Sequence, residues 1–112
     1  MPEHTFNIAT DFSPYPGPRL KIQGPHSGET LRGKLAKLLR SKPGRIVVVL
    51  DGTSGYGSSF LDEAFGGLVR TEKFDRNQVL NRLELVSRLD PTYVDEIIDS
   101  IKRAEPAGTA SA

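Results

Sequence analysis

The fold of this chain is decided by residues 45–60, which read RIVVVLDGTSGYGSSF. Ile46–Leu50 is a continuous apolar run rich in β-branched side chains, which is typical of a strand buried on both faces. The glycines at positions 52, 55 and 57 predict a loop, and Ser58 is expected to begin a helix that runs to about Arg70. A buried strand that leads through a glycine-rich loop into a helix indicates an α/β fold.

Periodicity predicts the elements on either side of this segment. Further strands are expected over Thr5–Ala9, Arg19–Gln23 and Val79–Val86. A helix capped by Ser27 is expected to run to about Arg40, and a final helix is expected to begin at Asp90-Pro91. The alternation of strands and helices predicts an α/β domain with a mixed, partly parallel sheet of about four strands, against which about three helices pack.

The composition limits the class of protein. The 112 residues suit one domain, expected over residues 1–104, whereas residues 105–112 carry no large apolar side chain and are expected to be disordered. A net charge of +1 gives no global attraction for nucleic acid or an anionic membrane. The chain has no cysteine, no 18-residue apolar run and no signal-like start. We therefore expect a cytoplasmic protein without membrane or nucleic-acid partners.

The glycine- and serine-rich segment lies at the carboxyl end of the buried strand, where α/β proteins usually place their sites. It completes no known motif, because a P-loop needs Gly-Lys-Ser/Thr, a dinucleotide loop needs glycine where Phe60 stands, and a hydrolase elbow needs a serine between two glycines. The sequence places neither His4 nor His26 beside the serines as a base. We expect no catalytic residue, cofactor or metal, although a deep polar pocket beside Ser59 would argue for an enzyme.

The same segment is expected to bind a protein partner. Tyr56 is either an exposed binding anchor or a cover for the core, and Ser58 and Ser59 are either partner contacts or helix caps. Asp51 is expected to accept hydrogen bonds from loop amides. The candidate set is Asp51, Gly55, Tyr56, Gly57, Ser58, Ser59 and Phe60. The alternative is a module that senses a small ligand, anion or nucleotide through the glycine-rich loop and the helix N-terminus.

Two further patterns have structural interpretations. Gly66 and Gly67 would weaken the predicted helix unless a neighbouring element approaches its backbone closely, so close packing is expected there. Basic side chains surround the end of the helix that Ser27 caps, and they are expected to form a solvated face: Lys34, Lys37, Arg40, Lys42 and Arg45.

Three blocks of the sequence are similar to those of a known family: Pro16-Gly17, the stretch from Gly24 to Glu29, and above all Val49–Arg70. In these blocks the chain resembles the STAS-like proteins of unknown function. These are small bacterial domains related to the STAS fold of anti-sigma-factor antagonists and sulphate-transporter tails. The resemblance runs from about Phe12 to Arg70.

The resemblance implies a non-enzymatic regulatory domain that docks on a protein partner, often a histidine-kinase-like ATPase that acts as a switch kinase. In anti-sigma-factor antagonists a strand runs into Asp-Ser-Ser/Thr-Gly at a helix start, and a serine there is phosphorylated. By position Ser59 matches that serine, with Gly57 in place of the aspartate and Phe60 in place of the glycine. The identity of the partner and the oligomeric state stay open.

Overall fold

The computed structural model describes residues 3–105 and contains one three-stranded sheet. Its strands are β1 (Glu3–Asn7), β2 (Arg45–Val49) and β3 (Leu83–Val86), in the order β1-β2-β3. Both pairings are parallel, and the register aligns Phe6 with Val48 and Val48 with Leu85. The sheet is therefore parallel throughout its described strands, where the sequence predicted a mixed one.

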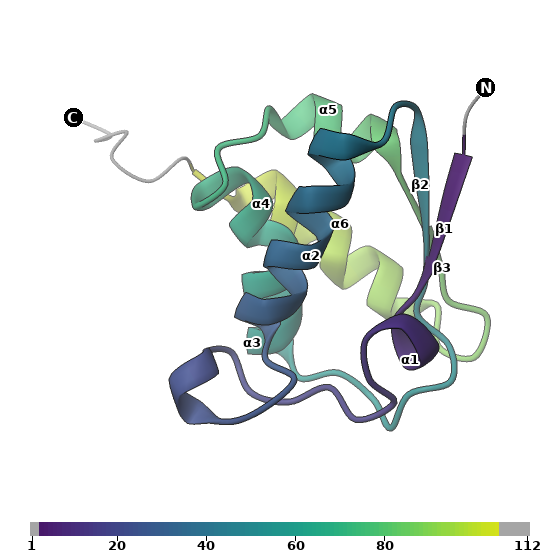
Figure 1. The fold of residues 1–112 in the computed structure, drawn as a ribbon, viewed down its shortest axis with the longest axis vertical. Helices are drawn as coiled ribbons and strands as arrows, with labels where there is room; N and C mark the ends of the chain where they lie inside the picture. Colours follow the sequence, from purple (N-terminus) through teal and green to yellow (C-terminus); the bar gives the residue numbers. More distant parts are fainter. Residues whose placement is uncertain (1–2, 106–112) are drawn as a thin grey trace.

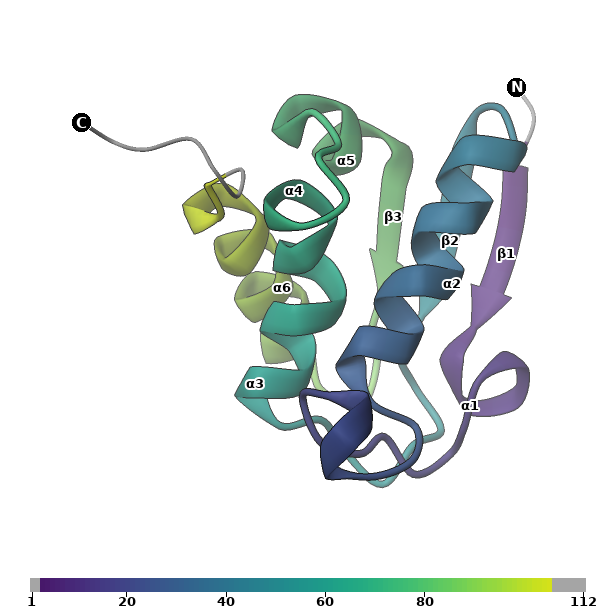
Figure 2. The ribbon, with the colours of Figure 1, turned by 60° about the vertical axis from the view of Figure 1, so that its left-hand side comes forward.

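The helices lie on one face of this sheet (Figure 1). Figure 2 shows the same layer from another side, and no described helix covers the other face of the sheet. The helices are α1 (Ile8–Asp11), η1 (Lys21–Gln23), α2 (Gly28–Ser41), α3 (Ser58–Leu61), η2 (Asp62–Gly66), α4 (Gly67–Arg70), α5 (Arg76–Arg82) and α6 (Thr92–Arg103). The segments α3, η2 and α4 follow one another directly, with a wide π turn at η2, and together they are called the 58–70 helix below.

The two faces of β2 differ in burial. Ile46 and Val48 point toward the helices and are completely buried, whereas Val47 and Val49 are only partly buried on the other face. The prediction of a strand buried on both faces is therefore wrong for one of them, because the described helices form a layer on one side only. The hydrophobic core lies between the sheet and that layer.

The strand predicted over Arg19–Gln23 is absent, and this is why the sheet has three described strands instead of about four. The segment forms the short turn η1, and its alternating Leu20 and Ile22 are 36% and 92% exposed. The loop that contains it closes on itself, since the Gly17 backbone N–H donates to the His26 carbonyl oxygen at 2.8 Å. Alternation of apolar side chains indicates a strand only where there is a surface to bury them against.

The strand predicted over Val79–Val86 is half helix. Asp75 caps α5 by accepting a hydrogen bond from the Gln78 N–H at 3.0 Å, and the strand begins only at Leu83. The Arg82 guanidinium donates to the carbonyl oxygen of Leu39 at 2.7 Å, which fixes the end of α5 against the end of α2. Local capping and this long-range contact explain why the helix takes the first half of the segment.

Several predictions about helices are confirmed. The Ser27 hydroxyl accepts from the Thr30 N–H at 3.1 Å and caps α2, and Asp90 accepts from the Thr92 N–H at 3.1 Å before α6. A Cβ on Gly66 would lie 3.2 Å from the Ser100 carbonyl oxygen of α6, so a neighbouring element does approach this glycine closely.

Two other expectations concern the C-terminal residues and membrane-spanning helices. The expected disorder of residues 105–112 concerns, apart from Glu105, residues outside the described part of the chain. Within residues 3–105, no helix has the length and apolar character needed to cross a membrane.

Candidate functional site

The loop between β2 and the 58–70 helix is held at its beginning by Asp51. The Asp51 carboxylate accepts hydrogen bonds from the backbone N–H groups of Arg88 and Leu89 at 2.9 to 3.0 Å. These donors lower the pKa of Asp51 because they favour the charged carboxylate. Asp51 therefore accepts from backbone amides, as expected, but from those of the loop that follows β3. It ties together the ends of two parallel strands.

Tyr56 folds back over the core, which is the second of its two predicted placements. Its hydroxyl donates to the Leu50 carbonyl oxygen at 2.7 Å, and its ring lies 5.0 Å from that of Tyr93 in an edge-to-face arrangement. Burial raises the pKa of Tyr56 to about 12, so the phenol is neutral at physiological pH. Tyr56 closes the loop onto the end of β2 and presents little surface to a partner.

Phe60 lies beneath the site and not on it. Its side chain is 0% exposed and its ring packs 5.8 Å from Tyr56 and 6.3 Å from Phe12. The loop glycines also differ in role. Gly52 and Gly55 have φ values of 94° and 123°, which favour glycine, whereas Gly57 has an ordinary φ of −77° and is the N-cap of α3.

Ser58 and Ser59 form the accessible part of the candidate site. Both are exposed, and neither hydroxyl makes a hydrogen bond to another described residue. The predicted role as helix caps is therefore wrong, because Gly57 occupies the N-cap position and no side chain caps the helix there. Two adjacent hydroxyls are thus presented to solvent at the start of a helix.

A polar hollow of about 380 Å³ lies beside these serines. Its other lining residues come from three parts of the chain: Arg19, Asp62, Glu96, Ser100 and Arg103. Arg19 pairs with Asp62 at 3.1 Å and Arg103 pairs with Asp99 at 2.8 Å, so both cations are already engaged. No histidine lines the hollow, and the serines therefore have no imidazole base within it.

A smaller hollow of about 170 Å³ lies at the glycine-rich loop itself. It is bounded by Asp51, Asp90 and Tyr93 together with the loop backbone. Two carboxylates at its wall make it unsuitable for a phosphate or another anion. Among residues 3–105 no group of three or more His, Asp or Glu side chains is arranged to hold a metal ion.

No sequence pattern indicated the charged residues that surround the serines. Arg19 lies in a proline- and glycine-rich stretch, and Arg103 lies in the last turn of α6, so neither has a motif that links it to Ser59. Glu63 is only 8% exposed and pairs with Arg19 at 3.2 Å and with Arg32. Apolar spacing predicts which helix face is buried, but not which charged side chains meet across it.

Taken together, the parallel sheet, the single helical layer and the exposed helix start define a small α/β domain. Residues 27–103 match the model of the family described as STAS-like domain of unknown function (DUF4325), and the chain belongs to this family. No curated protein and no solved structure matches the chain.

The family match confirms the resemblance and shifts its bounds. It begins at Ser27 and continues through α6 to Arg103, whereas the sequence resemblance was placed from about Phe12 to Arg70. It includes the 58–70 helix and both serines. Strand β1 and the loop that contains Arg19 precede the matched residues.

Proposed function

We propose that this chain is a non-enzymatic regulatory domain of bacterial signalling that acts in the cytoplasm by binding a protein partner. The partner class is a histidine-kinase-like ATPase, as for anti-sigma-factor antagonists, and the contact surface is centred on Ser58 and Ser59. Phosphorylation of Ser59 by the partner controls the complex. The family itself supports only a STAS-like domain. The partner class and the phosphorylation are what the resemblance to anti-sigma-factor antagonists implies, and the choice of contact surface rests on the geometry of the helix start.

One observation carries the proposal: the two serine hydroxyls are exposed at the start of a helix whose other residues are buried, apart from the partly exposed Asp62 and Arg70. Neither hydroxyl is used by the described part of the chain, so both are available to a kinase or to a partner surface. Tyr56 and Phe60 support this surface from below, through the Tyr56 hydrogen bond to Leu50 and the packing of the two rings. A rigid support beneath an exposed hydroxyl is suited to recognition.

Phosphorylation would change the charge of this surface strongly. The Ser59 oxygen attacks the γ-phosphorus of ATP held by the partner, the bond from that phosphorus to the β–γ bridging oxygen breaks, and ADP leaves. The serine proton passes to a base of the partner. The product carries about −1.5 to −2 charge at pH 7. Arg19 and Arg103 in the adjoining hollow already pair with carboxylates, so most of that charge is left unbalanced and an apolar or acidic partner surface would be repelled.

At two positions the chain differs from the anti-sigma-factor-antagonist pattern, with Phe60 in place of the glycine and Gly57 in place of the aspartate. Phe60 replaces a glycine but is buried, so it does not obstruct the serines. Gly57 replaces an aspartate and caps α3 through its backbone alone, which leaves the kinase to supply any carboxylate contact. Docking needs neither the aspartate nor the glycine of that pattern.

The alternative of an anion- or nucleotide-sensing module has less support. The hollow at the glycine-rich loop is walled by Asp51 and Asp90, which repel anions. The hollow beside the serines contains Arg19 and Arg103, but each already has a carboxylate partner. An anion there would have to displace those carboxylates.

The proposal is tested with the purified chain, ATP labelled at the γ-phosphate, and the histidine-kinase-like ATPase encoded in the same genome. We expect label on the wild type and on Ser58→Ala, and none on Ser59→Ala. Ser59→Asp is expected to weaken binding of the ATPase at least tenfold by surface plasmon resonance. Its free energy of unfolding should change by less than about 0.5 kcal/mol, as at other surface positions.

Equal labelling of the two alanine variants would refute Ser59 as the acceptor. Unchanged binding by Ser59→Asp, together with unchanged binding by Ser58→Asp, would remove this helix start from the contact surface.

A further inference from the structure

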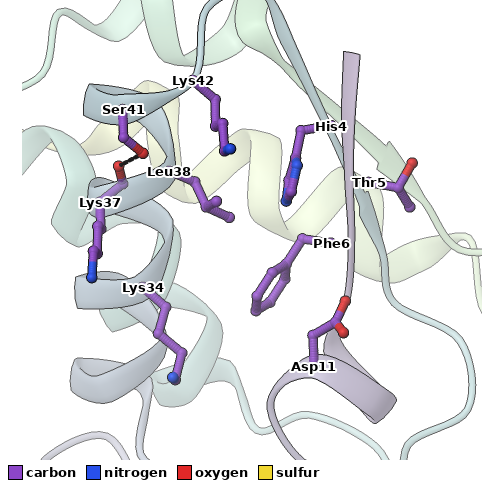
Figure 3. Close-up of a pocket in the computed structure, with 9 residues that line it drawn as sticks. All are labelled: His4, Thr5, Phe6, Asp11, Lys34, Lys37, Leu38, Ser41 and Lys42. Carbon is purple, nitrogen blue, oxygen red and sulfur yellow. Dashed lines mark hydrogen bonds between the residues drawn. The ribbon is translucent and has the colours of Figure 1, made fainter.

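A groove of about 480 Å³ lies between β1 and α2, away from the serines (Figure 3). Its floor includes Phe6 from β1 and Leu38 from α2. His4 and Phe6 point from the strand toward the helix, whereas Thr5 points to the other face of the sheet. The groove therefore lies between α2 and the helix-facing side of the edge strand β1.

The groove is strongly basic. Lys34, Lys37 and Lys42 line it from α2 and its end, and none of the three forms an ion pair with a described residue. This divides the basic cluster that the sequence predicted to be a solvated face. Arg40 pairs with Glu72 at 3.1 Å and Arg45 pairs with Glu84 at 2.8 Å, whereas the three lysines are left with unbalanced charge around one groove.

The strand beside these lysines has an open edge. β1 pairs with β2 on one side and with no described strand on the other. At the end of β1 the Asn7 backbone N–H donates to the Asp11 carboxylate at 2.8 Å, so this N–H points away from β2. Backbone groups alternate in direction along a strand, and those of Thr5 therefore point to the same open edge.

The Asp11 carboxylate shows that an oxygen acceptor can bind the open edge of β1. It is the one carboxylate among the residues that line the groove, and it is already hydrogen-bonded to the strand. It lies at the same end of the groove as Lys34, while Lys42 and His4 lie at the other end (Figure 3). An added strand would place its backbone carbonyl oxygens where the Asp11 carboxylate now accepts, and its acidic side chains could then face the lysines.

We propose that this groove binds an extended acidic segment of a partner protein, which adds to the open edge of β1 as a further strand and places its acidic side chains against Lys34, Lys37 and Lys42. Strand addition supplies backbone hydrogen bonds, and the alternate side chains on the inner face provide specificity. The surface is separate from the serine-led helix start and does not depend on its proposed role.

The charge of the groove selects this occupant over two others. Pairing of β1 with β1 of a second copy would bring two sets of three unpaired lysines together, which is repulsive. A single-stranded nucleic acid would satisfy the lysines but not the strand edge, and of the two rings in the groove Phe6 is only 7% exposed, which leaves His4 as the one ring for base stacking.

The test uses a fluorescent eight-residue peptide in which Glu and Val alternate, with both ends blocked, and measures its binding to the intact chain by fluorescence anisotropy. Two control peptides are used. One has four Glu followed by four Val and keeps the charge and composition but not the alternation. The other has Lys in place of Glu and keeps the length and alternation but reverses the charge. We expect the alternating acidic peptide to bind at least tenfold more tightly than either.

Two N-methylated peptides test the backbone contact. In a strand, residues whose side chains share a face also share the direction of their N–H groups. Methylation of all Glu nitrogens therefore abolishes binding if the segment is parallel to β1, and methylation of all Val nitrogens abolishes it if the segment is antiparallel. One methylated peptide should bind and the other should not. Binding by both, or by neither, overturns strand addition.

The lysines are tested by the double variant Lys34→Glu/Lys37→Glu. The matched control is Lys21→Glu/Lys102→Glu, which changes the net charge equally at exposed positions outside the groove. We expect at least a tenfold loss of peptide binding in the first variant and less than a twofold change in the second, with circular dichroism unchanged in both.

Three results overturn the proposal: equal losses in the two double variants, tighter binding of a labelled eight-nucleotide oligo(dT) than of the peptide, or a chain that elutes as a dimer through β1. Ser59→Asp should leave peptide binding unchanged, so a failure here is distinct from a failure of the serine site.

Discussion

The start and the middle of the 58–70 helix differ in nearly every physical respect. Ser58 and Ser59 are exposed and make no side-chain hydrogen bonds to the described residues, whereas the apolar side chains that follow are completely buried: Phe60, Leu61, Ala64, Phe65 and Leu68. The middle is enclosed because α2 and α6 both pack against it. Because its middle is packed on both sides, the helix holds its first turn at a constant position. The side chains of that turn can therefore be substituted or modified without unfolding the domain.

The largest expected effect comes from truncating the middle. Phe65 is 0% exposed, so Phe65→Ala removes a large buried ring and leaves a cavity. The free energy of unfolding should fall by about 3 to 5 kcal/mol in urea denaturation. Phe65→Leu is the control, with an expected loss of about 1 to 2 kcal/mol because most of the volume is retained. A loss below about 1 kcal/mol for the alanine variant would contradict a closely packed middle.

The next effect tests the boundary between start and middle, where α2 crosses the helix. A Cβ on Gly28 would lie 2.6 Å from the Phe60 carbonyl oxygen, so Gly28→Ala pushes the two helices apart. We expect a loss of about 1 to 3 kcal/mol in the free energy of unfolding. Gly33 lies in the same helix with no atom within 4 Å of its Cβ position, so Gly33→Ala should instead stabilise the domain by about 0.5 to 1 kcal/mol. The same sign for both would refute the close crossing.

A smaller effect tests the support beneath the start. Tyr56→Phe removes the hydroxyl that donates to the Leu50 carbonyl oxygen at 2.7 Å and leaves the ring contacts in place. The free energy of unfolding should fall by about 1 kcal/mol, the typical net contribution of one hydrogen bond. Tyr15 is 70% exposed, and Tyr15→Phe is the control with a change within about 0.5 kcal/mol. Equal effects would mean that the Tyr56 hydroxyl does not hold the loop.

The sequence predicted the strand–loop–helix unit well because its signals are local. The apolar run of β2, the cap at Ser27 and the helix that begins at Ser58 each follow from residues within a few positions of one another. The strand predicted over Arg19–Gln23 is absent for the opposite reason, since its alternating side chains have no surface to pack against and Ile22 is 92% exposed. Whether a short pattern forms a strand depends on the rest of the fold.

The candidate site was predictable in its position but not in its surroundings. Ser58 and Ser59 lie exposed where the sequence placed them, yet Phe60 points into the core and Tyr56 covers it. Arg19 is 43 residues away from Asp62 in sequence and reaches the hollow beside the serines only through tertiary folding. The direction of a side chain on a helix depends on what packs against each face, which one sequence does not specify.

The smallest expected effect concerns Asp51, which joins the loop before the helix start to the loop after β3. Because the N–H groups of Arg88 and Leu89 lower its pKa in the folded state, the carboxylate stabilises the fold above its unfolded pKa, about 3.9. That stabilisation is lost as the pH falls through the lower folded pKa. Asp51→Asn should therefore be less stable than the wild type at pH 7, and the difference should shrink as the pH falls below about 4.

Thermal unfolding at a series of pH values between 7 and 2 measures this difference. The control is Asp95→Asn, because Asp95 is exposed and makes no side-chain hydrogen bond to another described residue. The effect at Asp51 is expected to be the smallest because water competes for a carboxylate near the surface. A difference that persists unchanged at the lowest pH would show that Asp51 acts through its shape and not its charge. Asp51 would then hold the loop before the helix start through a contact that does not depend on its charge.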